Sequence, residues 1–264
     1  MSKAPAAYRE SIAAMDPGQL ESLYRTYNRR KYVHPDPLEC VYGYASVPDR
    51  EIAAFVAAAL AYGNVGQILR SVYAALGIMG DSPRSYLVQQ DVHGLYADYS
   101  GFVHRFAAGR HMAAMLAGIK GVIHEYGSLQ DAFAQATSDA DETYVPALSA
   151  FIEKLRSYAP ADPGHLLASP DKGSACKRLF LFLRWIVRCD AVDPGGWDRM
   201  SAAKLVVPLD VHMYRACCGL GLTGRRRADL KTALEITAGF ARLVPEDPVR
   251  YDFVLTRPGI RGPW

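Results

Sequence analysis

The chain has 264 residues, of which 50% are hydrophobic and 22% charged, with a formal net charge of +3 and a pI near 8.5. This size can bury one large core or two modest lobes, and the mild charge permits a local nucleic-acid-binding patch without demanding one. No apolar run is long enough to predict a membrane span. The first ten residues lack the apolar core of a signal peptide, so we expect a cytoplasmic protein.

Helical patterns dominate the first half of the chain. The predicted helices there are 49–62, 64–76, 102–126 and 144–158. Asp49 is the expected N-cap of the first helix and Gly63 is its end. The wide apolar stripe of residues 102–126 is typical of a core-facing helix or helix pair. The Pro- and Gly-containing segment 159–164 ends the last of the four.

The second half continues this pattern. A strongly apolar helix is predicted from Lys177 to Arg188, and further helices over 225–243 and 248–255. Only Leu205–Val207 suggests extended structure, and three residues cannot build a sheet. We find no internal repeat and no low-complexity stretch. The sequence therefore predicts an all-α protein.

The five cysteines show no C-x-x-C spacing. In a protein expected in the cytoplasm, this pattern favours reduced and mostly buried thiols over disulfides or zinc ligands, and the sequence predicts no metal site. The five positions are Cys40, Cys176, Cys189, Cys217 and Cys218.

Lys177 and Asp210 are the candidate reactive pair. Lys177 opens the apolar helix, where partial desolvation favours a nucleophilic amine. Asp210 lies where a loop ends and the next helix begins. The unpaired N–H groups and positive dipole end of a helix start favour both an ionised aspartate and a bound phosphate. Together the two residues indicate imine chemistry on a sugar carbon beside a polyanion.

The segment from about Ser169 to Gly221 resembles the helix-hairpin-helix DNA glycosylases, which excise damaged bases. Its stretch 208–215 (Pro-Leu-Asp-Val-His-Met-Tyr-Arg) is close to the P-V-D-V-H-M segment of 8-oxoguanine glycosylases. Lys177 stands where the bifunctional members carry their nucleophilic lysine. The separation of Lys177 and Asp210, 210 − 177 = 33 positions, is similar to that of the archaeal 8-oxoguanine glycosylases.

A longer stretch, from about Pro48 to Ile260, resembles an uncharacterised bacterial family distantly related to that superfamily. Its members carry the patterns K-R-L-x-x-F-L-R-W-x-V-R, P-L-D-x-H-x-x-R and D-P-V-x-Y-D-F. Two features depart from the superfamily pattern. The hairpin 169–175 contains one glycine, Gly173, and the four-cysteine iron–sulfur site of some members is absent.

The resemblance implies a two-lobed helix-hairpin-helix glycosylase-like fold with a cleft between the lobes. Residues 1–264 would form one helical unit, with the hairpin and catalytic segment at about 169–221. It implies a DNA-repair enzyme of base excision repair, a bifunctional DNA glycosylase and abasic-site lyase. The substrate would be double-stranded DNA with an oxidised purine, above all 8-oxoguanine, and the enzyme a monomer without a membrane partner. No cofactor is implied, although such a hairpin can hold a monovalent cation.

In this mechanism Lys177 attacks C1′ of the flipped-out nucleotide, while Asp210 helps to deprotonate Lys177 and stabilises the cation developing on the sugar. Simpler interpretations stay open. Lys177 can be a surface lysine at a helix start, with Lys172 of the hairpin as the alternative nucleophile. Asp210 can be an ordinary N-cap, which is compatible with catalysis because a cap holds an ionised carboxylate rigidly. His212, a candidate pocket residue, fits a structural histidine better than an acid or base.

A basic stripe follows Lys177 along its helix. Arg184 and Arg188 recur at intervals of seven and four residues and so share its face. Charges on an otherwise apolar helix need water, a carboxylate or a phosphate. Arg184 is therefore a candidate contact to the flipped nucleotide. The alternative for both arginines is a set of buried ion pairs with three nearby aspartates, Asp190, Asp193 and Asp198.

Other segments supply further candidates for the nucleotide pocket. Residues 61–68 resemble the glycosylase helix–turn that carries an Asn or Gln near the extruded nucleotide, which points to Asn64 and Gln67; a helix cap is the alternative for Asn64. Asp252 can accept hydrogen bonds from a purine edge. Three aromatic residues are candidates for stacking on the base, with a place in the core as the alternative: Phe180, Trp185 and Phe253.

Basic and small residues in the hairpin and around the following helices are candidates for contacts to the DNA backbone. A solvated turn is the alternative for the basic run. The candidates are Lys172, Gly173, Ser174, Arg215, Arg225, Arg226, Arg227 and Lys231.

Two other functions stay open at this point. The first is a non-catalytic relative that recognises damaged or structured nucleic acid without cutting it. The second, from an unrelated class, is an α-helical enzyme that forms a lysine imine with a small carbonyl substrate. Covalent capture by borohydride on lesion DNA distinguishes the three, because only the glycosylase is captured there.

Overall fold

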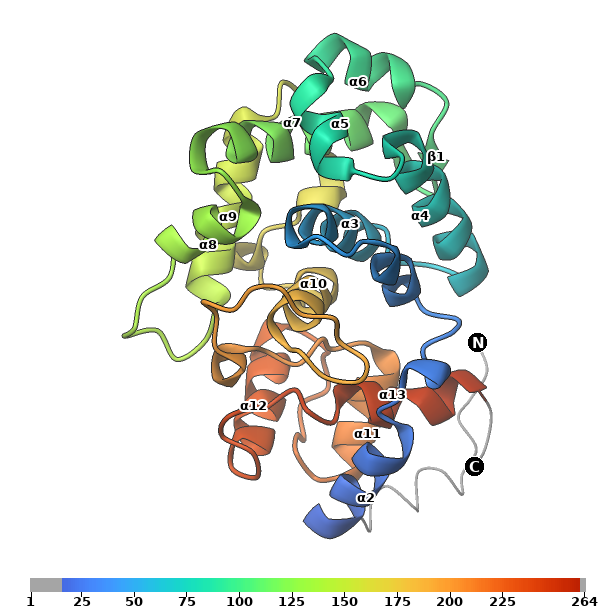
Figure 1. Cartoon of the computed structure of the whole chain (residues 1–264). Helices are drawn as coiled ribbons and strands as arrows, with labels where there is room; N and C mark the ends of the chain where they lie inside the picture. Colours follow the sequence, from blue (N-terminus) through green and yellow to red (C-terminus); the bar gives the residue numbers. More distant parts are fainter. Residues whose placement is uncertain (1–15, 262–264) are drawn as a thin grey trace.

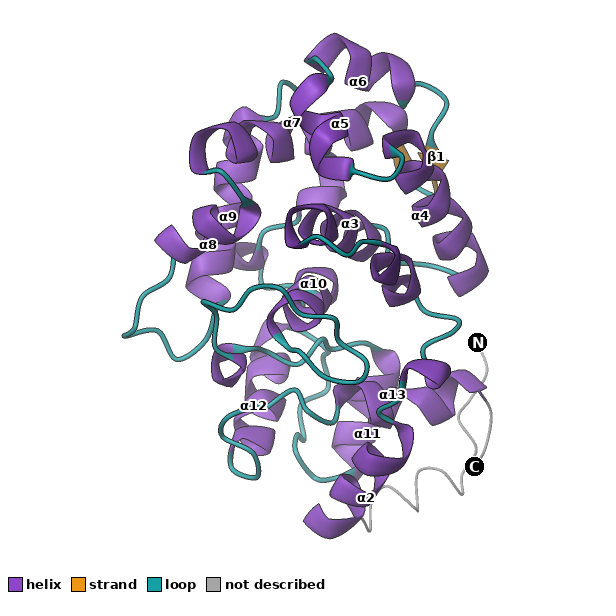
Figure 2. Ribbon diagram, in the orientation of Figure 1, coloured by secondary structure: helices purple, strands orange, loops and turns teal. Residues whose placement is uncertain are grey.

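A computed structural model describes residues 16–261, and helices make up most of it (Figures 1 and 2). The all-α prediction is confirmed. In the described part the only strands are two-residue pieces, β1 (Val103–His104) and β2 (Ala107–Ala108), which form one antiparallel hairpin. No helix within residues 16–261 combines the length and the apolar character needed to cross a membrane.

The helices lie in two groups with α10 (Lys177–Val187) between them (Figure 1). The upper group in Figure 1 consists of α3 (Val47–Ala59), α4 (Val65–Met79), α5 (Pro83–Gln89), α6 (Val92–Asp98), α7 (Gly109–Tyr126), α8 (Leu129–Gln135) and α9 (Val145–Tyr158). The lower group consists of α2 (Pro17–Tyr27), α11 (Val211–Gly219), α12 (Leu230–Ala241) and α13 (Asp252–Arg261). Short 3-10 turns connect them: η1 (Arg30–Tyr32), η2 (Pro37–Gly43), η3 (Gly164–Leu167), η4 (Pro170–Lys172) and η5 (Ala202–Lys204).

The central position of α10 follows from its composition, because a helix that is apolar on almost every side is stable only when it is buried. It packs against α3, where the ring centroids of Phe182 and Phe55 are 5.0 Å apart. Trp197 meets Phe182 edge-on at 5.2 Å. The start of α10, where Lys177 lies, is partly exposed to solvent.

α2 joins the C-terminal helices although it lies at the other end of the described chain (Figure 1). Arg250, just before α13, pairs with Glu21 at 2.9 Å, and the rings of Tyr24 and Tyr251 meet edge-on at 6.4 Å. This docking carries the segment 33–37 to α13, which places N-terminal residues at the site described below.

The N-cap of α3 differs from the prediction. Ser46 caps the helix and Pro48 occupies its first turn, a position that favours proline because no backbone donor is lost there. Asp49 instead accepts hydrogen bonds from the Ser82 hydroxyl (2.8 Å) and the Arg84 backbone N–H (2.9 Å). It therefore ties the start of α3 to the start of α5.

The stretch 102–126 contains more than a helix. The β1–β2 hairpin comes first, and α7 begins only at Gly109, where an added Cβ would lie 1.7 Å from the Tyr99 carbonyl oxygen. Only glycine allows so close a start. The apolar residues of the β1–β2 hairpin continue the apolar stripe of the helix, so the hydrophobic periodicity did not indicate that α7 begins at Gly109. In the same way α12 and α13 begin at Leu230 and Asp252, later than their patterns predict.

Candidate active site

Lys177 and Asp210 form an ion pair where two helices begin. Lys177 is the first residue of α10 and Asp210 is the N-cap of α11, and Nζ lies 3.0 Å from Oδ2. The other carboxylate oxygen accepts hydrogen bonds from the backbone N–H groups of His212 (2.9 Å) and Met213 (2.8 Å). The carboxylate therefore caps α11 and holds the ammonium group at the same time.

The pair is partly open to solvent, with 35% of the Lys177 side chain and 22% of the Asp210 side chain exposed. Burial raises the pKa of Asp210, but the Lys177 charge and the hydrogen bond from the Met213 backbone outweigh it, so this pKa lies below its usual value. Asp210 is thus ionised at neutral pH. This state suits a group that stabilises a positive charge, and it makes Asp210 a weak base for deprotonating Lys177.

A tight turn brings the chain to Lys177. Gly173, which follows η4, has a φ of +71°, and Cys176 adopts a φ of +44°. Left-handed backbone is strained for a residue with a Cβ, and such strain is typical of functional sites. No side chain caps α10. The N–H groups and the positive dipole end of α10 are therefore directed towards the region around Lys177 without a side-chain acceptor.

The pair borders a pocket of about 270 Å³, which we call the Lys177 pocket. Its apolar walls include Val65, Ile68, Leu181 and Pro208. Its charged residues, besides the pair itself, are Asp36, Arg184, Asp252 and Arg257. Apolar walls with a few convergent polar groups are typical of sites that bind small molecules or single chemical groups.

Arg184 and Asp252 form a buried ion pair in this lining, and each is 3% exposed. Burial raises the pKa of Asp252 to about 6, since the nearby Arg184 charge only partly opposes this effect and Asp210 adds repulsion. Burial therefore favours the protonated form of Asp252 more than it does for an exposed aspartate. Both residues were predicted to contact the flipped nucleotide, and both lie in the lining.

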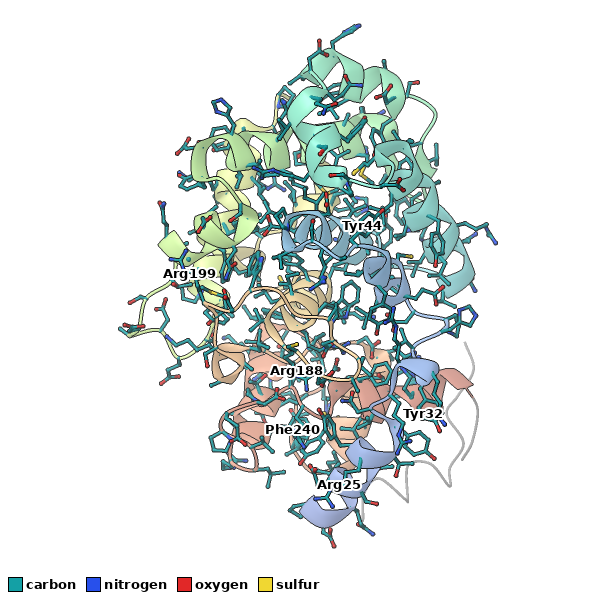
Figure 3. The ribbon with its side chains drawn as sticks, in the orientation of Figure 1. Arg25, Tyr32, Tyr44, Arg188, Arg199 and Phe240 are labelled. Atoms are coloured by element: carbon teal, nitrogen blue, oxygen red, sulfur yellow. The ribbon has the colours of Figure 1, made fainter. Side chains whose placement is uncertain are left out.

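Arg188, one turn after Arg184, is enclosed between α10 and the lower helices (Figure 3). It pairs with Asp190 (2.8 Å), Asp247 (3.0 Å) and Asp193, and Asp193 also lies 3.2 Å from Arg184. Burial opposes the charge on Arg188, but these carboxylates raise its pKa above the usual value. The alternative interpretation of both arginines as partners of buried aspartates is thus confirmed. We call the set the Arg184–Arg188 network: Arg184, Arg188, Asp190, Asp193, Asp247 and Asp252.

The membership of this network differs from the expectation in two ways. Asp198 does not belong to it, because its carboxylate accepts a hydrogen bond from Gln130 at 3.1 Å. Asp247 and Asp252 do belong, although they lie 59 and 68 positions from their arginine partners. The D-P-V-x-Y-D-F segment contains both aspartates, but nothing in its pattern shows which helix they face.

Sequence reasoning missed a second charged pair in the Lys177 pocket, Arg257 with Asp36. The guanidinium of Arg257 donates to the Val33 carbonyl oxygen at 3.0 Å and packs over the Phe253 ring at 4.2 Å. Its Nε has no hydrogen-bond partner in the described part of the protein. The two partners are 221 positions apart, so no local pattern could have indicated the pair.

The aromatic candidates lie in the core and do not reach the pocket lining. Phe180 and Trp185 are 1% and 0% exposed, and Phe253 is 1% exposed. α10 is enclosed by other helices along most of its length, so its aromatic residues pack inward. The core alternative is therefore the correct one for all three.

Asn64 and Gln67 also lie outside the lining of the Lys177 pocket. The Asn64 side-chain oxygen accepts the Gly66 backbone N–H at 3.0 Å and caps α4, in agreement with the alternative interpretation. Gln67 is exposed. Their neighbours Gly63 and Val65 line the pocket instead.

The hairpin residues 169–175 lie against the start of α12. The Gly173 carbonyl oxygen accepts the Leu230 N–H at 3.3 Å, and Ser174 forms a bridge to Asp229. Gly173 and Ser174 are exposed. The hairpin 169–175 and the start of α12 therefore lie side by side.

Four basic residues lie just before α12 or in its first turn. Arg225 is held by Thr232 (3.0 Å) and by Asp229 (3.5 Å). The other three basic residues of the run are exposed: Arg226, Arg227 and Lys231. Arg215 is half-buried on α11, and the side chain of Lys172, at the end of η4, lies outside the described residues.

His212 lines the Lys177 pocket beside Asp210 and is half-buried. Within the described residues, no group of three or more His, Cys, Asp or Glu side chains is arranged to hold a metal ion. The five cysteines are free thiols; three are buried as expected, and two are exposed, Cys189 and Cys218.

A second pocket, also of about 270 Å³, lies on the hairpin side of Lys177. Tyr62, Ser174, Cys176 and Arg178 line it, and Lys177 itself belongs to both pockets. Arg178 is fixed by the Ala59 carbonyl oxygen at 2.6 Å. Lys177 thus lines two cavities, one with the charged lining and one beside the hairpin 169–175.

Comparison with known proteins places the chain in a family. A search of curated proteins and a search of solved structures gave no match. A family model described as "Protein of unknown function (DUF2400)" matches residues 36–261, which include the Arg184–Arg188 network, the hairpin 169–175 and the lining of the Lys177 pocket except Pro35. The chain belongs to the DUF2400 family.

Proposed function

We propose that this protein is a bifunctional DNA glycosylase and abasic-site lyase that removes an oxidised purine, 8-oxoguanine first among the candidates. The observation that carries the proposal is the Lys177–Asp210 pair, 3.0 Å apart at the edge of a pocket. The proposed reaction needs a lysine beside a group that stabilises positive charge on the sugar, and an adjacent space for the reacting carbon. The ion pair and the pocket beside it support both conditions; Ser174 of the hairpin lines the second pocket and forms a bridge to Asp229, which follows the basic run.

The proposal includes the fold type, two helical lobes of the helix-hairpin-helix glycosylase kind with the cleft between them. The two helix groups around α10 support it, as does the turn at Gly173 that leads into Lys177. The partner is double-stranded DNA, bound by a monomer in the cytoplasm during base excision repair. The DNA backbone would follow the hairpin and Arg225–Arg227, since exposed arginines beside backbone N–H groups suit phosphates.

The chemistry follows from the pair. Lys177 first loses its ammonium proton to solvent, and the lone pair of the neutral amine attacks C1′. The bond from C1′ to the base breaks, and the base leaves with the electron pair of that bond and accepts a second proton from the attacking nitrogen. Opening of the sugar ring then yields an imine between Nζ and C1′. Loss of a C2′ proton breaks the C3′–oxygen bond, which cuts the strand 3′ to the lesion. Water hydrolyses the imine and restores Lys177.

Asp210 contributes charge rather than basicity in this scheme. Its lowered pKa keeps it ionised while positive charge develops on the sugar, and the two backbone hydrogen bonds fix its position. In the Lys177 pocket, Arg184 and Arg257 supply donors, and Asp36 and Asp252 supply acceptors, for the edge of a flipped base. A pocket of about 270 Å³ suits one nucleobase rather than a larger ligand.

Borohydride trapping on a panel of duplexes, each with one lesion, tests the proposal. The wild-type protein should be captured on one oxidised purine, and Lys177→Gln should abolish capture and nicking while DNA binding persists. Lys172→Gln is the matched control and should be captured like the wild type. If Lys172→Gln is the variant that loses capture, Lys172 is the nucleophile. Tight lesion binding without capture would indicate a non-catalytic reader, and capture by small carbonyl compounds alone would indicate an unrelated imine-forming enzyme.

A further inference from the structure

Asp252, the first residue of α13, has one carboxyl oxygen that no other group binds. Its Oδ2 pairs with Arg184, whereas no residue in the described part of the chain donates a hydrogen bond to Oδ1. Oδ1 is not one of the fully enclosed polar atoms that lack a partner, so it reaches open space although the residue is only 3% exposed. Because Asp252 lines the Lys177 pocket, this oxygen is free to bond to a group that enters the pocket.

The other two carboxyl groups in this lining are differently placed, because both of their oxygens already have partners. Asp36 accepts a backbone hydrogen bond at 2.9 Å with Oδ1 and pairs with Arg257 through Oδ2. Asp210 holds Lys177 with one oxygen and caps α11 with the other. Asp252 therefore combines a free oxygen with a second oxygen that is held in a fixed place.

The surroundings of Asp252 favour its protonated form. α13 packs against α11, and the two helices lie side by side in the lower group (Figure 1). Burial and the negative charges of Asp210 and Asp193 raise the pKa of Asp252, and the Arg184 charge only partly opposes them. A protonated carboxyl group that is fixed at the wall of a pocket can donate its proton to the occupant of the pocket.

The proposed reaction includes a step that requires such a donor. When the bond between C1′ and the base breaks, the base leaves with the electron pair and becomes an anion unless a proton reaches it. Asp210 is unsuited to supply this proton, because its pKa is lowered and it is ionised. A positioned acid typically accelerates a step of this kind by about 10²- to 10⁴-fold.

We propose that Asp252 is the acid that protonates the departing base, and thus a further catalytic residue of the Lys177 pocket. The proton passes from Oδ1 to a ring nitrogen of the base as the bond from C1′ to the base breaks. The carboxylate left on Asp252 then takes up the proton that the attacking nitrogen of Lys177 gives up. The base therefore gains the proton that Lys177 loses, and Asp252 returns to its acid form. The inference rests on the proposed function, because it takes a flipped base as the occupant of the pocket.

The test separates base release from cleavage of the abasic site. Asp252→Asn keeps the size of the side chain but removes the acid. On a duplex with the lesion that the wild type excises, and with saturating enzyme in excess, this variant should release the base about 10²-fold or more slowly. On a duplex with a preformed abasic site there is no base to protonate. Borohydride capture and strand cleavage by Asp252→Asn should therefore match the wild type there, which also shows that the variant is folded.

Asp247→Asn is the matched control. Asp247 belongs to the same buried network through Arg188, but it lies outside the linings of both pockets that contain Lys177. This variant should release the base at the wild-type rate. An equal loss of base release in Asp247→Asn and Asp252→Asn would overturn the proposal, because the loss would then come from the network and not from an acid.

Two other results would also overturn the acid: a wild-type rate of base release in Asp252→Asn, or equal losses on the lesion and on the preformed abasic site. Either result leaves the proposed function intact if the wild type is captured on both substrates. A wild-type protein that cleaves the preformed abasic site but releases no base from any lesion removes the glycosylase and the acid together and leaves the lyase. A wild-type protein that is captured on neither substrate overturns the whole proposed function.

Discussion

The positive charges at the two ends of α10 differ in their exposure to solvent and in the number of their carboxylate partners. At its start, Lys177 has 35% of its side chain exposed and a single carboxylate partner. At its other end, Arg184 and Arg188 are 4% exposed at the side chain and share four aspartates. The comparison shows why Lys177 suits the proposed reaction better than the two arginines do. Lys177 has a cavity on each side, whereas the arginines have all their charged neighbours within the protein.

The physical reason is the cost of burying a charge. A guanidinium taken out of water is stable only with several well-placed carboxylates, and removal of one member leaves the others unpaired in a medium that solvates them poorly. A pair at the surface contributes little to stability, because water solvates either partner when the other is gone. We therefore expect the Arg184–Arg188 network to govern folding and the Lys177–Asp210 pair to govern chemistry.

The largest expected effect is on stability at the buried end. Arg188→Gln should lower the free energy of unfolding by about 3–5 kcal/mol, because Asp193 and Asp247 lose their shared cation. Lys177→Gln, at the other end of the same helix, should change it by no more than about 1 kcal/mol. Urea denaturation of both variants measures the difference. Similar losses in the two variants would contradict the distinction between the ends.

The pH dependence of stability sharpens the comparison at Asp252. Its pKa is raised from 3.8 to about 6, so the folded protein holds this proton more tightly than the unfolded chain does. The stabilising contribution is complete below about pH 3.8 and is lost as the pH rises through about 6. Relative to Asp252→Asn, which cannot titrate, the wild type should lose roughly 3 kcal/mol across this window, at about 1.4 kcal/mol per pKa unit.

Urea denaturation of both proteins at pH values from about 4 to about 8, which cover most of the titration of Asp252, measures this difference in the free energy of unfolding. A difference that stays constant would mean that Arg184 holds Asp252 ionised throughout, as in an ordinary ion pair. A difference of opposite sign would mean that the network stabilises the carboxylate more than burial destabilises it.

Substitution of Asp210 should have the smallest effect on the free energy of unfolding. It should nevertheless slow base release clearly. Asp210→Asn keeps most of the capping ability but removes the charge beside Lys177, so base release should fall by about 10²-fold or more. The free energy of unfolding should change by no more than about 1 kcal/mol, the usual worth of a cap. Single-turnover base release and thermal melting measure the two quantities.

Asp91→Asn is the matched control, because Asp91 caps α6 in the same way, accepting the Gly94 N–H, and lies outside both pockets that contain Lys177. It should reproduce any small stability change of Asp210→Asn without affecting base release. A fully active Asp210→Asn, or one that merely unfolds, would show that Asp210 is structural.

Local patterns in the sequence determined the helical class, the start of α10 at Lys177 and the position of Asp210 at the start of α11. These features depend on periodicity, turns and caps, which act over a few residues. They were sufficient to name both members of the candidate pair, although their separation of 3.0 Å across 33 positions comes from the packing of α10 and α11.

Tertiary structure alone decided which charges surround that pair. Asp252 reaches Arg184 across 68 positions, and Arg257 reaches Asp36 across 221, and no local pattern encodes such distances. It also decided that Phe106 stands in water beside Gly63, whereas Phe180 and Trp185, equally apolar in sequence, are buried. Burial depends on which surfaces meet when the helix groups pack, and the same residue type is a core side chain or an exposed contact according to that packing.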